Sequence, residues 1–223
     1  RRRCGQRIVH VKCAVHRDVA GRRHFVGDPD HTMSFSDYLD VVESYESKVS
    51  QDLDVYLGKV SLGIDLPELY ADVEAALIDP KRAFGACFGS AINGGVHTYF
   101  GCGRNTTAIH FDPVDNLLAC IFGTKRLWLY PPSDAHWLYP TGDCTRSGVV
   151  PFTHFTDLPE ELQPKFSLAM RANPVEVTLK AGDVLYLPCG WWHCVQGSEE
   201  RNMVLSYMFT VHPAKRAAQG AMC

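Results

Sequence analysis

The chain has 223 residues, of which 46% are hydrophobic and 21% are charged, a composition typical of a folded globular domain rather than a disordered segment. The mean hydropathy is −0.12, and no run approaches the roughly eighteen apolar residues that a membrane-spanning helix needs. The formal net charge of −3 excludes a chain-wide electrostatic attraction to nucleic acid. We therefore expect one domain over residues 1–223 and no membrane partner.

The nine cysteines are scattered and form no Cys-x-x-Cys pair, so neither a zinc ribbon nor a thioredoxin-like site is predicted. This cysteine usage, without a secretory leader pattern, favours an intracellular location in the nucleus or the cytoplasm. Residues 1–31 carry eight lysines and arginines against three acidic residues, which suits either a solvated tail or an arm that contacts RNA. The chain starts at Arg1, and we expect it to be truncated at both ends.

Strands and helices are predicted over the N-terminal part, residues 1–95. Apolar and polar residues alternate over 7–15 and over 53–60, a pattern that predicts two strands. A polar stretch over 18–30 reads as turns.

Two helices are predicted in the same part of the chain. Ser34 followed by Asp37 forms a capping signature at the start of the first helix. Six apolar residues then recur at spacings of three and four: Phe35, Tyr38, Leu39, Val42, Tyr45 and Val49. The second helix is predicted over 67–77, with Pro67 in its first turn.

Short β-strands dominate residues 96–210, separated by glycines and prolines that mark turns. Because no long helices alternate with these strands, the pattern favours an antiparallel sandwich or barrel over a doubly wound sheet. Residues 133–173 are loop-rich, with one short helix predicted over Leu158–Phe166.

The most informative local pattern is His110-Phe111-Asp112. On a strand, residues two apart point to the same side, so His110 and Asp112 would present an imidazole and a carboxylate together. His193, at the end of another predicted strand, would complete a set of two histidines and one carboxylate, the facial triad of non-haem Fe(II) oxygenases. His-x-Asp alone is a weak signal, because most such tripeptides arise by chance.

The surrounding motifs make the pattern specific. They are concentrated in NTTAIHFDPVDNLLACIFGTKRLWLYPPSD and in AGDVLYLPCGWWHCV. In their order and spacing, from Val55 to Phe209, they resemble the JmjC/cupin-like family of 2-oxoglutarate-dependent oxygenases. The resemblance is closest to the small hydroxylase branch that includes the asparaginyl hydroxylase of the hypoxia pathway. It implies a mainly β fold with flanking helices, a double-stranded β-helix (jelly roll), whose catalytic core would span residues 96–210.

The resemblance also assigns roles to individual residues. His110, Asp112 and His193 match the three Fe(II) ligands, and Lys125 matches the lysine that pairs with the distal carboxylate of 2-oxoglutarate. Thr107 matches a hydroxyl on the same carboxylate. On a regular strand Thr107 would face away from His110, so a bulge or twist is required.

Further positions match the co-substrate pocket. Tyr56 resembles the tyrosine that completes the pocket, although an ordinary strand aromatic is an equal alternative. Asn116 resembles an asparagine near the metal-bound end of the co-substrate, and Ser206 stands where the hydroxylase pattern has a second asparagine. Met208 replaces a common aromatic. Trp191 and Trp192 are expected to pack the end of the barrel and fix the approach of the histidine that follows.

The implied activity is a dioxygenase that consumes 2-oxoglutarate and O2 and hydroxylates a protein side chain. Hydroxylation of a modified RNA base and demethylation of histone lysines are alternatives within the family. A cupin of another class, a metal-dependent isomerase or a binding protein, is the alternative outside it. We expect a protein or peptide substrate, with RNA as the alternative partner, and a monomer, because only thirteen residues follow Thr210.

Overall fold

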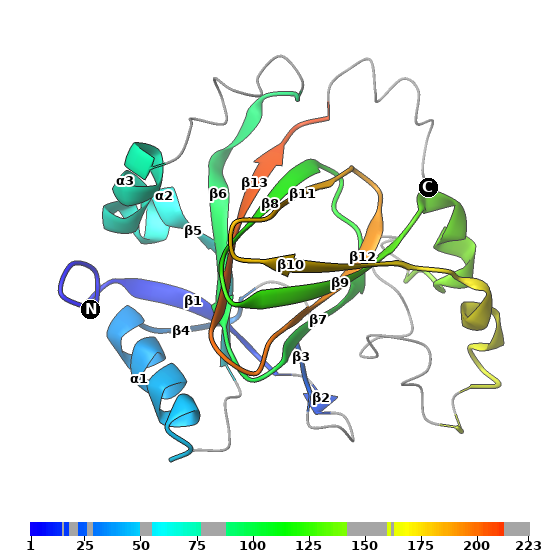
Figure 1. Ribbon diagram of the computed structural model, residues 1–223, viewed down its shortest axis with the longest axis horizontal. Helices are drawn as coiled ribbons and strands as arrows, with labels where there is room; N and C mark the ends of the chain where they lie inside the picture. The colour runs from blue at the N-terminus through cyan, green and yellow to red at the C-terminus, as the bar shows by residue number, and fades with distance from the viewer. Residues whose placement is uncertain are drawn as a thin grey trace.

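Two facing β-sheets form the body of the molecule (Figure 1). The structure is a computed structural model that describes residues 1–14, 16–17, 22–25, 29–49, 55–76, 88–141, 160–161 and 163–211. Neighbouring strands are antiparallel except β3 and β7, which run parallel. The expected mainly β architecture of the jelly-roll type is confirmed.

The larger sheet has seven strands in the order β11-β8-β13-β6-β5-β1-β4. Its strands are β1 (Ile8–Cys13), β4 (His31–Ser34), β5 (Val55–Ser61), β6 (Ala91–Gly101), β8 (Asp115–Phe122), β11 (Val184–Leu187) and β13 (Asn202–Phe209). The smaller sheet has six strands in the order β10-β9-β12-β7-β3-β2. They are β2 (His16–Arg17), β3 (Arg23–Phe25), β7 (Asn105–His110), β9 (Thr124–Tyr130), β10 (Val175–Lys180) and β12 (Trp192–Gly197).

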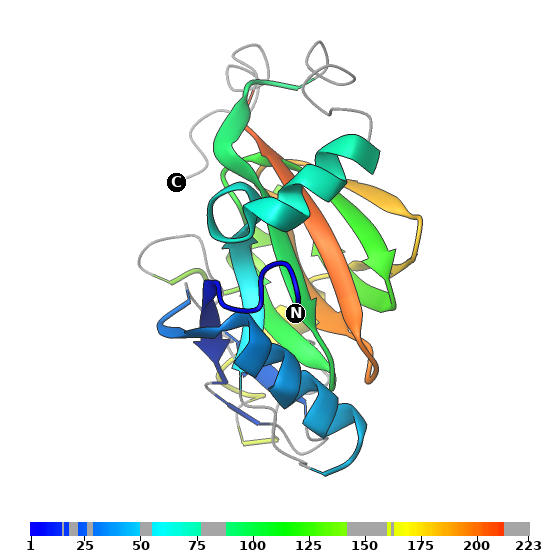
Figure 2. The same cartoon turned by 90° about the vertical axis from the view of Figure 1, so that its left-hand side faces the viewer.

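Helices lie against the outer face of the larger sheet (Figure 2). They are α1 (Phe35–Glu46), α2 (Leu62–Asp65) and α3 (Pro67–Ala76). The predicted cap of α1 is confirmed, because the Ser34 side chain accepts a hydrogen bond of 3.0 Å from the Asp37 backbone N–H. The apolar stripe is confirmed at Phe35, Tyr38 and Val42, which are buried, whereas Val49 lies beyond the helix and is exposed.

Tyr38 fastens α1 to two strands of the sheet. Its hydroxyl donates a hydrogen bond of 2.6 Å to the Phe100 carbonyl on β6. The same hydroxyl accepts a hydrogen bond of 3.2 Å from the Leu57 backbone N–H on β5. A buried hydroxyl must be paired to avoid a desolvation penalty, so these two bonds fix the helix over β5 and β6.

The N-terminal strands belong to the same two sheets as the jelly-roll core. β1, β4 and β5 extend the larger sheet, while β2 and β3 extend the smaller one. The interpretation of residues 18–30 as turns was incomplete, because Arg23–Phe25 pairs in parallel with β7. A three-residue strand has too few positions to show a period of two, and only the distant partner strand reveals it.

Two 3-10 helices, η1 (Pro132–Trp137) and η3 (Ser167–Arg171), lie near the two ends of the loop-rich segment 133–173. The helix predicted over Leu158–Phe166 lies partly outside the described residues, and those described there form turns. Within the described ranges, no helix combines the length and the apolar character needed to cross a membrane.

Substitutions at two turn glycines can distinguish the cost of a steric clash from the cost of a strained backbone conformation. Gly123 and Gly182 both have positive φ, of 72° and 97°, but a Cβ on Gly123 would lie 2.3 Å from the Arg201 carbonyl oxygen, whereas Gly182 has open space. We predict that Gly182→Ala lowers the free energy of unfolding by about 1 kcal/mol, and that Gly123→Ala lowers it by roughly 1–3 kcal/mol more. Urea titration measures both, and equal losses would contradict the predicted clash.

Candidate active site

The two histidines of the predicted triad face each other across a pair of antiparallel strands. His110 on β7 is the register partner of His193 on β12, and their ring centroids lie 4.3 Å apart. The Nδ1 atom of His110 bonds to the Ala108 carbonyl at 2.7 Å, and that of His193 bonds to the Trp191 carbonyl at 3.0 Å. With each Nδ1 donating to the backbone, Nε2 keeps its lone pair for a metal.

Asp112 completes the group directly after β7. Its Oδ2 atom lies 3.9 Å from His193 Nε2, and one ligand atom from each of His110, Asp112 and His193 falls within 4.8 Å of the others. The Gly190 backbone N–H donates to the Asp112 carbonyl at 3.1 Å, which ties the segment before His193 to the segment after His110.

A buried carboxylate holds the turn that precedes His193. Asp115 is 1% exposed, and its Oδ1 atom accepts hydrogen bonds from the Cys189 backbone N–H at 3.1 Å and from the Tyr186 hydroxyl at 2.9 Å. Gly190, at φ 79°, occupies the left-handed region that favours glycine. The Asp115 carboxylate and the conformation of Gly190 thus fix the turn just before β12, which begins at Trp192 and carries His193.

The donor set fits a divalent transition metal. Two imidazole nitrogens and one carboxylate on one side of an ion leave positions open for other ligands, the arrangement found in non-haem Fe(II) sites. Burial, together with the neighbouring His193, lowers the pKa of His110 to about 4. Its imidazole is therefore neutral near neutral pH, which is the form that binds metals.

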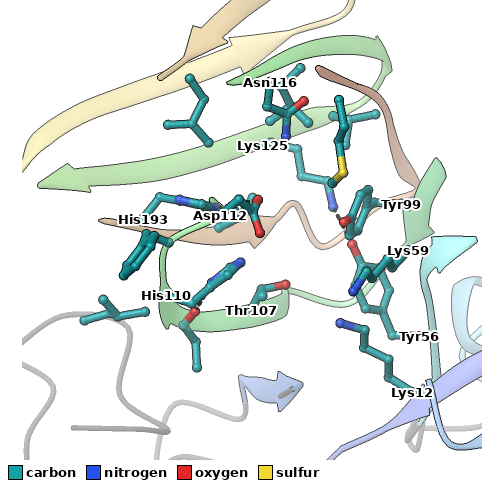
Figure 3. A pocket seen from close by; sticks show the side chains of 18 of the residues that line it. Lys12, Tyr56, Lys59, Tyr99, Thr107, His110, Asp112, Asn116, Lys125 and His193 are labelled. Carbon is teal, nitrogen blue, oxygen red and sulfur yellow. Dashed lines mark hydrogen bonds and ion pairs between the residues drawn. The ribbon is translucent and has the colours of Figure 1, made fainter. Parts of the chain in front are cut away.

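A cavity of about 240 Å³ lies between the sheets and is lined by all three triad residues. Figure 3 shows Lys125 and Tyr56 across the cavity from His193. Lys125 donates a hydrogen bond of 3.4 Å to the Tyr56 hydroxyl. Burial lowers the pKa of Lys125 to about 7 and raises the pKa of Tyr56 well above its ordinary value. A bound carboxylate would favour the charged ammonium here.

A strand irregularity brings Thr107 to the same cavity. Between β7 and β12 the register shifts, so that His110 pairs with His193 while Thr107 pairs with Val195. Three steps along β7 thus match two along β12, which is a β-bulge. Both Thr107 and His110 line the cavity. The bulge explains how two residues three positions apart on one strand can face the same side, as the sequence required.

Asn116 and Ser206 have different positions. Asn116 lines the cavity, whereas Ser206 is absent from the described lining and is fully buried. The Ser206 hydroxyl donates to Asn116 Oδ1 at 2.8 Å. This bond occupies the amide oxygen and leaves the Asn116 N–H groups for the cavity. Ser206 therefore acts behind Asn116, in place of the direct contact that the resemblance implied.

The tryptophans pack against the barrel. Trp192 is 2% exposed and meets Phe111 edge-on, with ring centroids 5.0 Å apart, while Trp191 packs against a second buried apolar cluster. Met208 lines the cavity.

Among the described polar residues that line the cavity, three are not predicted as site residues from the sequence: Lys12, Lys59 and Tyr99. Lys12 was assigned to the basic N-terminal segment, and the other two were unremarkable residues of predicted strands. Strand parity puts Lys12 on the opposite face of β1 from the buried Val11. No local signal shows what that face covers, because the cavity is formed by strands far along the chain.

Several basic residues of the N-terminal segment have internal partners in the folded protein. Arg1 pairs with Asp40 and Glu43 at 2.5 and 2.6 Å, Arg3 with Asp72 at 2.6 Å, and Arg7 with Glu68 at 2.5 Å. Arg23 is buried, and its guanidinium donates to the carbonyls of Cys102 and Gly103. Part of the sequence bias thus reflects internal ion pairs and hydrogen bonds.

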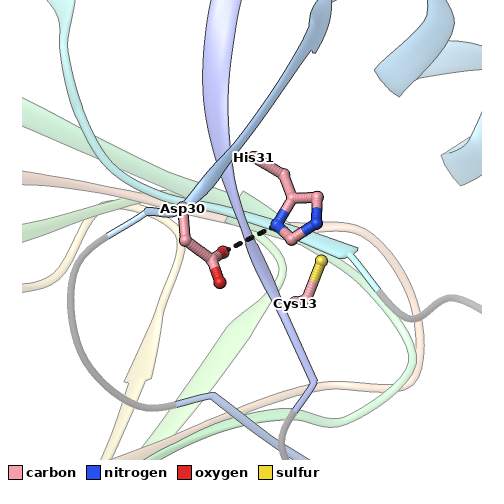
Figure 4. Close-up of side chains that lie close together, drawn as sticks. All are labelled: Cys13, Asp30 and His31. Atoms are coloured by element: carbon pink, nitrogen blue, oxygen red, sulfur yellow. Dashed lines mark ion pairs between the residues drawn. The ribbon is translucent and has the colours of Figure 1, made fainter.

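A second group of potential metal ligands lies at the ends of β1 and β4 (Figure 4). One ligand atom from each of Cys13, Asp30 and His31 falls within 4.8 Å of the others. Asp30 and His31 form an ion pair at 3.0 Å, and both side chains are 63% exposed. Solvent screens such a pair, which distinguishes it from the enclosed triad.

Comparison with known proteins defines the family. The family described as "Cupin-like domain" matches residues 3–215. JmjC domain-containing protein E of Dictyostelium discoideum is 23% identical over 90% of this chain and 64% of its own length. Jumonji C domain-containing protein 5 of Drosophila melanogaster is 28% identical over 72% of this chain and 38% of its own length. tRNA wybutosine-synthesizing protein 5 of Danio rerio is 42% identical over 38% of this chain and 23% of its own length.

The chain belongs to the cupin-like domain family, and its JmjC relatives confirm the resemblance found in the sequence. The chain spans from 23% to 64% of the length of these relatives.

Asp112→Ala tests the triad. Loss of a group that hydrogen-bonds to a metal ligand typically weakens metal binding by roughly 10–100-fold. Loss of the ligand itself should weaken it more, while the circular dichroism spectrum is retained. Metal content after loading with Fe(II) or Co(II) measures this effect. Cys13→Ser, in the exposed group, is the matched control and should retain one metal per chain. Full metal content in Asp112→Ala would contradict the assignment.

Proposed function

We propose that this protein is an Fe(II)- and 2-oxoglutarate-dependent dioxygenase that hydroxylates a side chain of a protein or peptide. The observation that supports this proposal most strongly is that one cavity contains both parts of such a site. The metal-ligand set of His110, Asp112 and His193 lies at one end, and the buried Lys125–Tyr56 pair lies across from it (Figure 3).

The residues of this chain would hold the co-substrate by both ends. When bound, iron would supply the activation of O2 that is coupled to decarboxylation of 2-oxoglutarate to succinate and CO2. Lys125 would pair with the distal carboxylate, to which the hydroxyls of Tyr56 and Thr107 would donate. Asn116, oriented by Ser206, would donate its amide N–H nearer the metal. The buried walls would exclude water from the reacting groups.

The substrate that we favour is a protein or peptide. We propose that the enzyme is a monomer and acts inside the cell, in the nucleus or the cytoplasm. Hydroxylation of an RNA base is the second candidate. It is supported by the similarity to the tRNA wybutosine-synthesizing proteins, which reaches 42% over 85 residues. Against it stands the pairing of Arg1, Arg3 and Arg7 with acidic side chains, since RNA binding depends on cations that are available to phosphates.

Conversion of 2-oxoglutarate to succinate tests the reaction class. The Fe(II)-loaded protein should form succinate, and N-oxalylglycine, which mimics the co-substrate, should block it. Protein and RNA fractions treated with the enzyme are then searched by mass spectrometry for the addition of one oxygen atom. Loss of a methyl group from lysine would indicate a demethylase instead. Absence of succinate under all conditions would favour a non-oxygenase cupin, an isomerase or a binding protein.

Lys125→Ala should weaken 2-oxoglutarate binding by roughly 10–100-fold, the cost of losing a charge-assisted contact, and should affect metal binding much less. Calorimetric titration of the Mn(II)-loaded protein with 2-oxoglutarate measures the first effect, and metal titration measures the second. Lys180→Ala, on the exposed end of β10, is the control and should bind like the unmodified protein. Unchanged affinity in Lys125→Ala would mean that another cation holds the acid.

The pH dependence of 2-oxoglutarate binding provides a separate test. Burial lowers the pKa of Lys125 to about 7, so above that pH the free amine must take up a proton to pair with a carboxylate. Affinity should therefore fall by up to about tenfold per pH unit above pH 7, until the pKa of the bound state is reached. Any binding that Lys125→Arg retains should lack this dependence, since guanidinium stays charged. A pH-independent affinity in the unmodified protein would refute the role of Lys125.

A further inference from the structure

An irregularity in β5 directs a lysine toward the cavity. Between β5 and β6 the register shifts from Leu57↔Phe100 to Val60↔Thr98, so the intervening Gly58 and Lys59 form a β-bulge. Lys59 has a φ of 64°, a left-handed conformation that costs a side-chain-bearing residue about 1 kcal/mol. Its side chain lines the cavity (Figure 3). Such strain is commonly retained where it positions a functional group.

A second lysine lies beside the bulge. Lys12 on β1 is the register partner of Tyr56 on β5, is 6% exposed and lines the same cavity. A Cβ on Gly58 would lie 3.3 Å from Lys12 Cε and 2.9 Å from Tyr56 Cε1. The absence of a side chain at Gly58 therefore leaves room for Lys12 and Tyr56 to lie against the bulge.

The three lysines of the cavity differ in depth. Lys125 is 1% exposed, Lys12 is 6% exposed, and Lys59 is exposed to solvent. A co-substrate enclosed in the barrel would therefore meet Lys125, whereas a molecule that arrives at the mouth would meet Lys59 first. Among the described residues that line the cavity, Asp112 is the one carboxylate, and it belongs to the metal-ligand set. The described lining therefore holds more basic than acidic side chains, a balance that favours an anion.

We propose that Lys59, with Lys12 beneath it, binds a carboxylate of the substrate, so that the preferred substrate is a peptide with an acidic residue close to the one that is hydroxylated. This inference rests on the proposed oxygenase function and specifies its substrate class. Two ammonium groups that line the same cavity can hold one carboxylate by charge-assisted hydrogen bonds.

A peptide fits the observations better than a nucleic acid. A polyanion is held by many cations spread over a surface. In this chain, several arginines outside the cavity are paired with acidic side chains: Arg1, Arg3, Arg7, Arg104, Arg126 and Arg201. The cationic groups at the mouth are instead confined to one place, which suits a single carboxylate.

Labelled ligand pools test the proposal with the Mn(II)-loaded protein in the presence of N-oxalylglycine. Three fluorescent random peptide pools carry fixed aspartates, fixed asparagines or fixed lysines, and a labelled oligouridylate serves as the RNA probe. Fluorescence anisotropy should show the tightest binding for the aspartate pool, with affinity falling as salt is raised.

Lys59→Gly removes the charge at a backbone conformation that glycine adopts readily, so this variant is expected to fold. It should weaken binding of the aspartate pool by at least about fivefold, and Lys59→Glu should shift the preference to the lysine pool. Lys48→Gly is the matched control, because Lys48 is also exposed and has a positive φ of 56° but lies outside the cavity lining. It should leave the affinities for all pools unchanged.

Several outcomes would overturn the inference. They are equal binding of the three peptide pools, no binding of any pool, or preferential binding of oligouridylate that Lys59→Gly abolishes. A loss of 2-oxoglutarate affinity in Lys59→Gly as large as the loss of peptide affinity would assign Lys59 to the co-substrate instead. Failure of the oxygenase proposal is recognised separately, by the absence of succinate in the unmodified protein.

Discussion

The antiparallel pairing of β7 with β12 is the constraint on which the site depends. It places His110 opposite His193, while a carbonyl two residues earlier in each segment holds the Nδ1 atom of each ring. The backbone bond from Gly190 to Asp112 connects the same two segments. Because these contacts are made by main-chain atoms of a sheet, the ligand set is preorganised by the fold rather than by flexible loops.

Burial of Lys125 in the cavity carries an energetic cost. Burial alone lowers the pKa of Lys125 from 10.5 to about 7, so the folded protein holds a lysine in a place that disfavours its charged form. The hydrogen bond to Tyr56 satisfies the amine but does not neutralise a charge. Such a cost is common in functional sites, which accords with the role proposed for Lys125.

The two ends of the cavity come from different parts of the chain. The metal ligands lie on or beside β7 and β12 of the smaller sheet, whereas Lys12, Tyr56 and Lys59 come from β1 and β5 of the larger sheet. Cupin-like folds support many activities, so membership of the family defines the scaffold and the residues define the chemistry. The metal-ligand set and the lysines of the larger sheet therefore depend on different strand pairings.

The sequence by itself determined the β-rich class, the capped helix after Ser34 and the triad candidates, because caps, periodicity and motif spacing are local properties. Only the tertiary structure placed Lys12, Lys59 and Tyr99 beside the pocket residues that the sequence had indicated. The bulge at Lys59 and the position of Ser206 behind Asn116 depend on strand registers, as does the irregularity that the sequence required at Thr107. Register arises from pairing between segments distant in sequence, and a shift of one residue reverses the face to which a side chain points.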